Sequence, residues 1–183
     1  MSERLFDAIE FAARAHRGQL RKLTRAPYLI HPLAVAETLI LWQAAEAVVV
    51  AGVLHDTVED TDATLADLAT RFGPDVAALV EVVSEPDKAL PWEARKEHTL
   101  ASLRQGPLEA VQLACADKLD NVRSMLVARE ADGEAALWAG FKRGRDAQRW
   151  YLGGVLDLAR ARAPEARWTR DYARAVEALF GAG

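Results

Sequence analysis

The residues best suited to chemistry lie in the run HDTVED at positions 55–60, directly after the most apolar stretch of the chain. The imidazole of His55 and the carboxylate of Asp56 are both metal ligands. If the helix continues through the run, Glu59 lies one turn beyond His55. Asp60 then lies one turn beyond Asp56, so that two acids face the same space as the two ligands. Charged groups beside an apolar core are usually paired or bound to a metal, which favours a metal site here. If this run is considered alone, the alternative is a solvated acidic loop at the end of the helix.

Two further residues favour a single metal site. His31 stands at the expected start of a helix, and Asp117 lies within the apolar frame LACADKL at 113–119, an unusual place for a surface carboxylate. Taken alone, a hydrogen-bonded loop histidine and a carboxylate paired with Arg are the alternatives. Together with His55 and Asp56 they supply two imidazoles and two carboxylates. Such a mixed set suits a divalent ion such as Mn, Fe, Zn or Mg, and we predict that the four residues bind one ion.

A basic segment precedes these ligands. Arg14, Arg17, Arg21, Lys22 and Arg25 fall within twelve residues of a chain whose net charge is −4. Arg offers a planar fork for phosphate and Lys a point charge, so we predict a local phosphate site in this basic segment. A solvated basic surface is the alternative, above all for Arg14 and Arg17.

Other candidate substrate contacts lie later in the chain. Asn121 follows Asp117 by one helical turn and is a candidate for ribose or phosphate recognition, with a local surface hydrogen bond as the alternative. Trp150 and Tyr151 are candidates for a base-stacking platform, although aromatic residues at helical spacing pack more often into a core. Cys115 is expected to be a small core residue.

The hydrophobic pattern predicts an all-α fold, because apolar residues recur at helical spacing and strict alternation is nearly absent. The stretch 44–57 is apolar almost all round, which is typical of a helix buried on every side. We expect residues 1–183 to form a single multi-helix bundle domain, with a core over about 5–160 and C-terminal helices to 183. The other helices are expected at 5–18, 32–42, 64–72, 75–84, 92–103, 108–129, 134–162 and 170–180.

Composition excludes several classes of protein. A chain of 183 residues with 51% hydrophobic and 27% charged residues is typical of a globular domain, and its single Cys excludes a disulfide scaffold. The charged N-terminus lacks the apolar region of an export signal, and no apolar run approaches the ~20 residues that cross a bilayer. We therefore expect a cytoplasmic protein without a membrane partner. The negative net charge argues against a nucleic-acid partner.

Three motifs in order resemble the HD-domain phosphohydrolases, and within them the hydrolase domain of RelA/SpoT-type alarmone enzymes and the small alarmone hydrolases. They are HRGQLRKLTRAPYLIHP at 16–32, LHDTVEDTD at 54–62 and ADKLDN at 116–121. The resemblance covers about residues 5–160. It implies an HD-domain bundle and hydrolysis of the 3′-diphosphate of a guanosine alarmone such as ppGpp, giving GDP or GTP and pyrophosphate.

The resemblance also implies roles for single residues. It implies one divalent ion, commonly Mn²⁺, on the four predicted ligands, with Glu59 and Asp60 orienting and activating the attacking water. Arg21, Lys22 and Asn121 fall at phosphate and nucleotide contact positions. One further candidate contact departs from the family's pattern, because Arg25 stands where the family often has Gly or an acidic residue. This departure affects the shape of the loop and hence the choice of base.

Two alternative functions follow from the same residues. One is an HD phosphohydrolase for another nucleotide, such as an adenosine alarmone or the 2′-phosphate of NADPH, because a basic loop and a metal can bind phosphate without selecting a base. The other is a non-enzymatic sensor that binds nucleotide or metal. The presence of both Glu59 and Asp60 argues against the sensor, since a pocket that only binds has no need of them.

Overall fold

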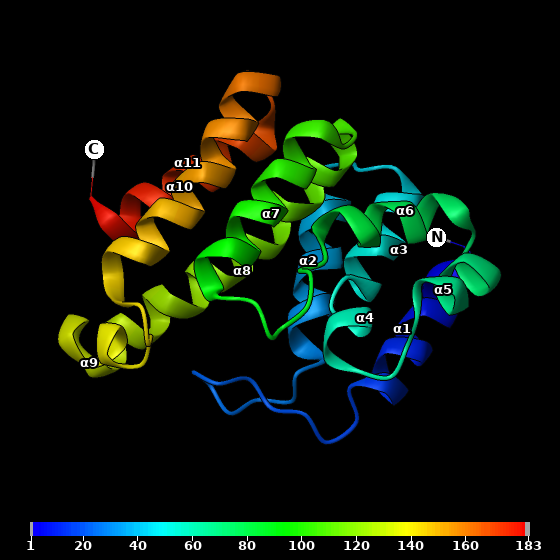
Figure 1. Ribbon diagram of the computed structural model, residues 1–183, viewed down its shortest axis with the longest axis horizontal. Helices are drawn as coiled ribbons and strands as arrows, with labels where there is room; N and C mark the ends of the chain where they lie inside the picture. The colour runs from blue at the N-terminus through cyan, green and yellow to red at the C-terminus, as the bar shows by residue number, and fades with distance from the viewer. Residues whose placement is uncertain (1, 182–183) are drawn as a thin grey trace.

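The computed structural model describes residues 2–181, and within them it is helical apart from loops and one isolated β-bridge between Leu20 and Pro27. No β-strand forms among these residues, so the predicted all-α fold is confirmed. Figure 1 shows the arrangement of the helices. In chain order they are α1 (Glu3–Ala15), α2 (Ile30–Leu41), α3 (Glu46–Leu54), α4 (Thr57–Asp60), α5 (Leu65–Phe72), α6 (Pro74–Val83), α7 (Trp92–Gln105), α8 (Leu108–Asp132), α9 (Glu134–Ala139), α10 (Gly144–Arg162) and α11 (Arg167–Phe180).

Helix α3 is the centre of the N-terminal half of the bundle. All of its residues from 48 to 54 are buried, and it packs against α1, α2, α6 and α8. Its apolar residues face neighbours on every side, as the sequence pattern predicts for a fully buried helix. The long helix α8 packs against α2 and α3 and also against α10 and α11, so it joins the N-terminal helices to the C-terminal pair (Figure 1).

A glycine sets the close approach of α2 to α3. A methyl group at Gly52 would lie 2.6 Å from Cδ1 of Leu39 and 3.4 Å from Cγ1 of Val35. Both of these α2 side chains are fully buried. Because the interior is close-packed, one added carbon would force the Leu39 side chain out of its place. The missing side chain therefore brings the helices that carry the two candidate histidine ligands into contact.

The predicted helix over 44–57 is wrong at its end, because α3 stops at Leu54 and α4 begins at Thr57. Two side chains donate hydrogen bonds to backbone carbonyls that would otherwise accept the next hydrogen bonds of the helix. The His55 Nδ1 donates to the carbonyl of Gly52 at 2.9 Å, and the Thr57 hydroxyl donates to that of Leu54 at 2.7 Å. Such side-chain bonds compete with the helical ladder. The chain therefore turns at His55 and Asp56.

The predicted continuous helix over 134–162 is also wrong. Helix α9 ends at Ala139, and α10 begins only at Gly144, whose φ of 69° lies in the left-handed region that favours glycine. The intervening residues 140–143 form a turn. In the described part of the chain no helix combines the length and apolarity that a bilayer crossing requires.

Shortening Leu39 tests the contact between α2 and α3. We expect Leu39→Ala to lower the free energy of unfolding by about 2–5 kcal/mol, because a fully buried leucine loses its contacts and leaves a cavity. Leu41→Ala on the same helix is the matched control, since Leu41 is 58% exposed and its loss should change stability by less than about 1 kcal/mol. Denaturant unfolding monitored by circular dichroism measures both. Equal losses from the two variants would contradict the described packing.

Candidate active site

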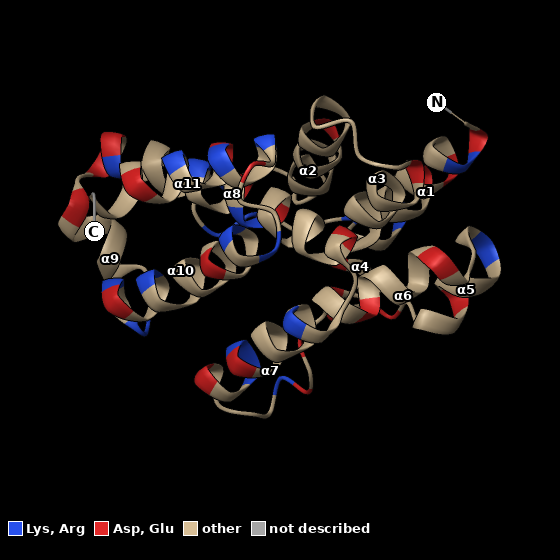
Figure 2. Ribbon diagram, turned by 90° about the horizontal axis from the view of Figure 1, so that it is seen from above, with Lys and Arg blue, Asp and Glu red and all other residues tan. Residues whose placement is uncertain are grey.

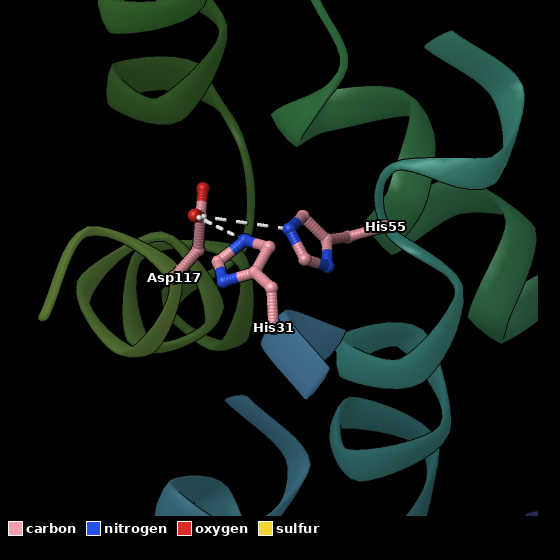
Figure 3. Close-up of side chains that lie close together, drawn as sticks. All are labelled: His31, His55 and Asp117. Carbon is pink, nitrogen blue, oxygen red and sulfur yellow. Dashed lines mark ion pairs between the residues drawn. The ribbon is translucent and has the colours of Figure 1, made fainter. Parts of the chain in front are cut away.

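Three side chains, from α2, from the turn after α3 and from α8, meet in the interior. His31 lies in the first turn of α2, His55 follows the end of α3, and Asp117 lies midway along α8; all three are buried. Their ligand atoms lie within 4.8 Å of one another. Figure 3 shows both imidazoles directed at the Asp117 carboxylate, whose Oδ1 lies 3.3 Å from Nε2 of His31 and 3.7 Å from Nε2 of His55. These residues could hold a metal ion.

Asp56 completes the predicted set of four. Its Oδ2 lies 3.1 Å from Nε2 of His55 and 3.5 Å from Nε2 of His31, and it accepts a hydrogen bond from the Tyr28 hydroxyl at 2.6 Å. The structure thus brings together all four residues that the sequence pattern placed around one ion. The turn at His55 and Asp56 lets these consecutive side chains face the same point.

The donor set fits a divalent cation. The His55 Nδ1 donates to a backbone carbonyl, which directs the opposite ring nitrogen, Nε2, toward the carboxylates. That Nε2 is buried and makes no hydrogen bond within the described residues. A buried polar atom without a partner is costly, and a metal ion would supply one. Two nitrogen and two carboxylate donors suit Mn²⁺, Fe²⁺ or Zn²⁺.

The four groups strongly perturb one another's ionisation. Burial alone lowers the pKa of His31 and His55, but the neighbouring aspartates outweigh it, so the pKa of each imidazole is raised. Burial likewise opposes ionisation of Asp56 and Asp117, yet the pKa of both carboxyls is lowered by the cations around them: for Asp56 chiefly His55, for Asp117 chiefly Lys118. The cluster without a metal therefore stabilises positive charge at its centre.

Two contacts to these ligands come from residues that the sequence reasoning gave no role. The Lys118 ammonium pairs with the Asp117 carboxylate, and the Tyr28 hydroxyl donates to Asp56. Both lie inside the motifs that carry the family resemblance, and Lys118 directly follows Asp117. Their positions in the motifs indicated that both residues lie near the site. Their direct contact with the ligands depends on side-chain directions, which the motifs do not give.

Glu59 and Asp60 have different surroundings. Burial and the charge of Asp56 raise the pKa of the half-buried Glu59 to about 7. Asp60 accepts a hydrogen bond from the Lys88 ammonium at 2.6 Å, and its side chain is 34% exposed. The backbone N–H of Asp60 donates to the carbonyl of Asp56 at 3.0 Å. Asp56 and Asp60 are therefore linked by one helical turn, although the helix is interrupted before it.

A cavity of about 870 Å³ adjoins the cluster. Asn121 and Tyr28 lie in its wall and also contact the ligands; the Asn121 amide donates to Oδ1 of Asp117 at 2.8 Å. Figure 2 shows the basic segment that follows α1 close to α8 and α10, which supply other parts of the lining. Five cations line the cavity: Arg21, Lys22, Arg95, Lys142 and Arg143.

The predicted substrate contacts divide into two groups. Arg21, Lys22 and Asn121 line the cavity. Trp150 and Tyr151 are not among its lining residues. Trp150 packs against Trp92 with ring centroids 6.0 Å apart, and Tyr151 is only 3% exposed beneath the Lys96 ammonium. The buried Tyr151 ring has no free face on which a base could stack. The aromatic residues that do line the cavity are Trp92, Phe141 and Tyr28.

Arg25 shapes the basic loop and is not among the cavity-lining residues. Its φ is 59°, in the left-handed region that non-glycine residues seldom occupy. Its N–H donates to the carbonyl of Arg21 at 3.0 Å, and the N–H of Arg21 donates to the carbonyl of Ala26 at 2.9 Å, which closes a tight turn. Glycine adopts this left-handed conformation more readily than arginine does.

Lys142 and Arg143 are cavity cations that the sequence reasoning missed. They lie in the turn between α9 and α10, a stretch that the helical pattern predicted to be continuous. The two nearby glycines, Gly140 and Gly144, were the signal that could have revealed the turn.

Comparison with known proteins identifies the family of the chain. The family described as HD domain (HD_4) matches residues 8–143. Guanosine-3′,5′-bis(diphosphate) 3′-pyrophosphohydrolase MESH1 of Drosophila melanogaster is 38% identical over 130 residues, or 69% of this chain and 72% of that protein. MESH1 of Homo sapiens is 42% identical over 124 residues, or 66% and 69% respectively. A solved metazoan ortholog of SpoT, described as hydrolysing ppGpp, aligns with a TM-score of 0.83 and 30% identity over 100% of this chain and 98% of that one.

The chain therefore belongs to the HD domain family, and the resemblance seen in its motifs is confirmed.

Metal affinity should rise with pH. The raised pKa values of His31 and His55 mean that, without metal, both imidazoles keep their protons to a higher pH than usual. A metal must displace these protons, so we expect the apparent affinity for Mn²⁺ to increase as the pH rises above the ordinary histidine pKa of 6.5, with protons released on binding. Calorimetry in buffers of different ionisation enthalpy counts those protons. Binding without proton release would contradict the described charge state.

Proposed function

We propose that this chain is a metal-dependent phosphohydrolase that removes the 3′-diphosphate of ppGpp, yielding GDP and pyrophosphate. The observation that carries the proposal is the adjacency of a buried two-His, two-Asp cluster to a cavity lined by five cations. The relatives named as ppGpp pyrophosphohydrolases support this substrate. We further propose that residues 1–183 act as one catalytic domain in the cytoplasm, with a nucleotide as its partner and neither a nucleic acid nor a membrane.

We assign the metal to His31, His55, Asp56 and Asp117 and propose Mn²⁺ as the ion. A bound divalent cation supplies charge stabilisation at a phosphoryl oxygen and a more acidic water. The chain's own residues keep the ligands in place. Lys118 pairs with Asp117, Tyr28 donates to Asp56, and the backbone of Gly52 fixes the ring of His55.

Glu59 is the residue we assign to accept the proton of the attacking water. It is half-buried, and its pKa of about 7 suits a group that takes up and releases a proton near neutral pH. Asp60, which pairs with Lys88 and lines the cavity of about 870 Å³, is assigned to orient the water or the leaving phosphate. The partial burial of Glu59 strengthens its electrostatic interactions with neighbouring groups.

Four of the five cations of the cavity form two groups that suit a nucleotide with two separate phosphate groups. Arg21 and Lys22 belong to the loop beside the ligands, whereas Lys142 and Arg143 belong to the turn between α9 and α10. We propose that the first group binds the diphosphate to be removed and that the second binds the 5′-phosphates. Apolar side chains of the same lining offer contacts for the base and ribose: Leu20, Leu23, Trp92, Met125 and Phe141.

The direct test is to incubate the purified protein with ppGpp and Mn²⁺ and to quantify GDP and pyrophosphate. Adenosine alarmones and NADPH are assayed in parallel, each with Mn²⁺, Zn²⁺, Mg²⁺ and Fe²⁺. We expect pyrophosphate release from ppGpp. If ppGpp is left intact while a known hydrolase cleaves it, the proposed substrate is wrong; tight nucleotide binding without turnover in any metal would favour a sensor.

Two substitutions should separate metal binding from proton transfer. Asp56→Ala removes a ligand, so we expect loss of both bound metal and turnover. Glu59→Gln keeps the shape but not the basic group, so metal content should stay the same while kcat falls by roughly 10²–10⁴-fold. Metal analysis after dialysis and steady-state kinetics measure the two properties. An active, metal-loaded Asp56→Ala protein would refute the ligand assignment.

Removing a cavity cation that lies in the turn between α9 and α10 should weaken substrate binding without disturbing chemistry at the cluster. We expect Lys142→Ala to raise KM for ppGpp by roughly fivefold or more, the effect of one lost phosphate contact, with little change in kcat. Arg104→Ala removes an exposed cation of α7 that is not among the cavity-lining residues and serves as the charge-matched control. The same KM for both variants would exclude Lys142 from the binding site.

A further inference from the structure

Asp120 connects the metal cluster to the phosphate-binding loop through a single oxygen atom. Its Oδ2 lies 2.6 Å from Nδ1 of His31 and 3.0 Å from NH1 of Arg21. The three side chains are largely enclosed, with exposed fractions of 16% for Asp120, 12% for Arg21 and 2% for His31. Asp120 is thus a carboxylate of α8 that touches one candidate metal ligand and one candidate phosphate contact at the same time.

The contact with His31 fixes which ring nitrogen is free for a metal. A carboxylate oxygen at 2.6 Å accepts the Nδ1–H, so Nε2 faces Asp117 and Asp56 at 3.3 and 3.5 Å. Carboxylates that hold the second ring nitrogen of a metal-binding histidine orient the ring and make it a stronger ligand. His55 differs, because its Nδ1 donates to a backbone carbonyl.

The contact with Arg21 fixes the guanidinium in the cavity wall. Besides the pair with Asp120, its NH2 donates to the Ser124 hydroxyl at 2.9 Å and to the Asn121 side-chain oxygen at 3.3 Å. All three partners lie on α8, so the loop residue is held against a rigid helix. Arg has five N–H donors, so these contacts still leave donors for a phosphate.

We propose that Asp120 is a positioning residue that orients His31 for the metal and Arg21 for phosphate, so that both binding events depend on one carboxylate. The inference rests on the proposed metal site and on a phosphate ligand, but not on the choice of nucleotide. A carboxylate that only attached the loop to α8 would support the fold without affecting metal affinity, and the experiment must separate these two roles.

The test compares Asp120→Ala with Asp120→Asn in two binding assays that need no turnover. Affinity for Mn²⁺ alone is measured by competition with a chelator, and binding of inorganic phosphate to the Mn²⁺-loaded protein is measured by calorimetry. We expect Asp120→Ala to weaken Mn²⁺ binding by about 10–100-fold, the range found when such outer partners are lost. Phosphate binding should weaken by roughly fivefold, because Arg21 loses a fixed partner.

Asp120→Asn should separate the two contacts. Its amide oxygen can still accept the Nδ1–H of His31, so the loss of Mn²⁺ affinity should be smaller than in the Ala variant. The neutral amide loses the ionic part of the contact with Arg21, so phosphate binding should weaken toward the level of the Ala variant. Asn and Ala variants with equally weak Mn²⁺ binding would overturn the assigned orientation of His31.

Two further variants complete the design. Arg21→Lys should weaken phosphate binding while Mn²⁺ affinity changes by less than about threefold, since Asp120 still holds His31. Asp157→Asn makes the same charge change on an exposed part of α10 and should alter neither assay. The inference fails if Asp120→Ala lowers only the unfolding temperature and leaves both affinities intact. Because neither assay uses ppGpp, failure to hydrolyse ppGpp would refute the proposed substrate and leave this result unaffected.

Discussion

The structure depends on holding two carboxylates and two imidazoles together in a buried space where α2, α3 and α8 meet. Separate ionised groups in such a place would be strongly destabilising, so each must find an opposite charge or a hydrogen bond. Lys118, Tyr28 and Asp120 supply such partners at the rim of the cluster. The carboxylates around the two histidines raise the pKa of both imidazoles. The chain thus folds around a point suited to positive charge.

Rigid packing of the helices fixes the geometry of the two-His, two-Asp cluster. Gly52 lets α2 approach α3, and α3 is enclosed on every side, so the histidines at the facing ends of these helices have fixed backbones. The end of α3 at Leu54 also contributes to this geometry. It turns His55 and Asp56 toward one centre through side-chain bonds to α3 carbonyls. An uninterrupted helix would have directed these consecutive side chains about 100° apart.

The cavity beside the cluster is assembled from segments distant in the chain. The basic loop after α1, the start of α7, the middle of α8 and the turn before α10 all contribute to its lining. A negatively charged chain thereby concentrates five cations at one place. Local concentration of positive charge of this kind attracts anionic ligands even when the molecule as a whole is acidic.

The sequence by itself determined the all-α fold, the buried central helix and the four residues that meet in the cluster. The spacing of hydrophobic residues and the residue types can be read directly from the sequence, and they predict the helices and the metal-binding side chains. The order of the three motifs identifies the family. Tertiary structure decided the rest. The helix ends at Leu54 because side chains capture its carbonyls, and Tyr151 lies under Lys96 rather than in the cavity. Lys142 joins the cavity only because a turn brings it there, since side-chain direction depends on neighbours that are remote in the chain.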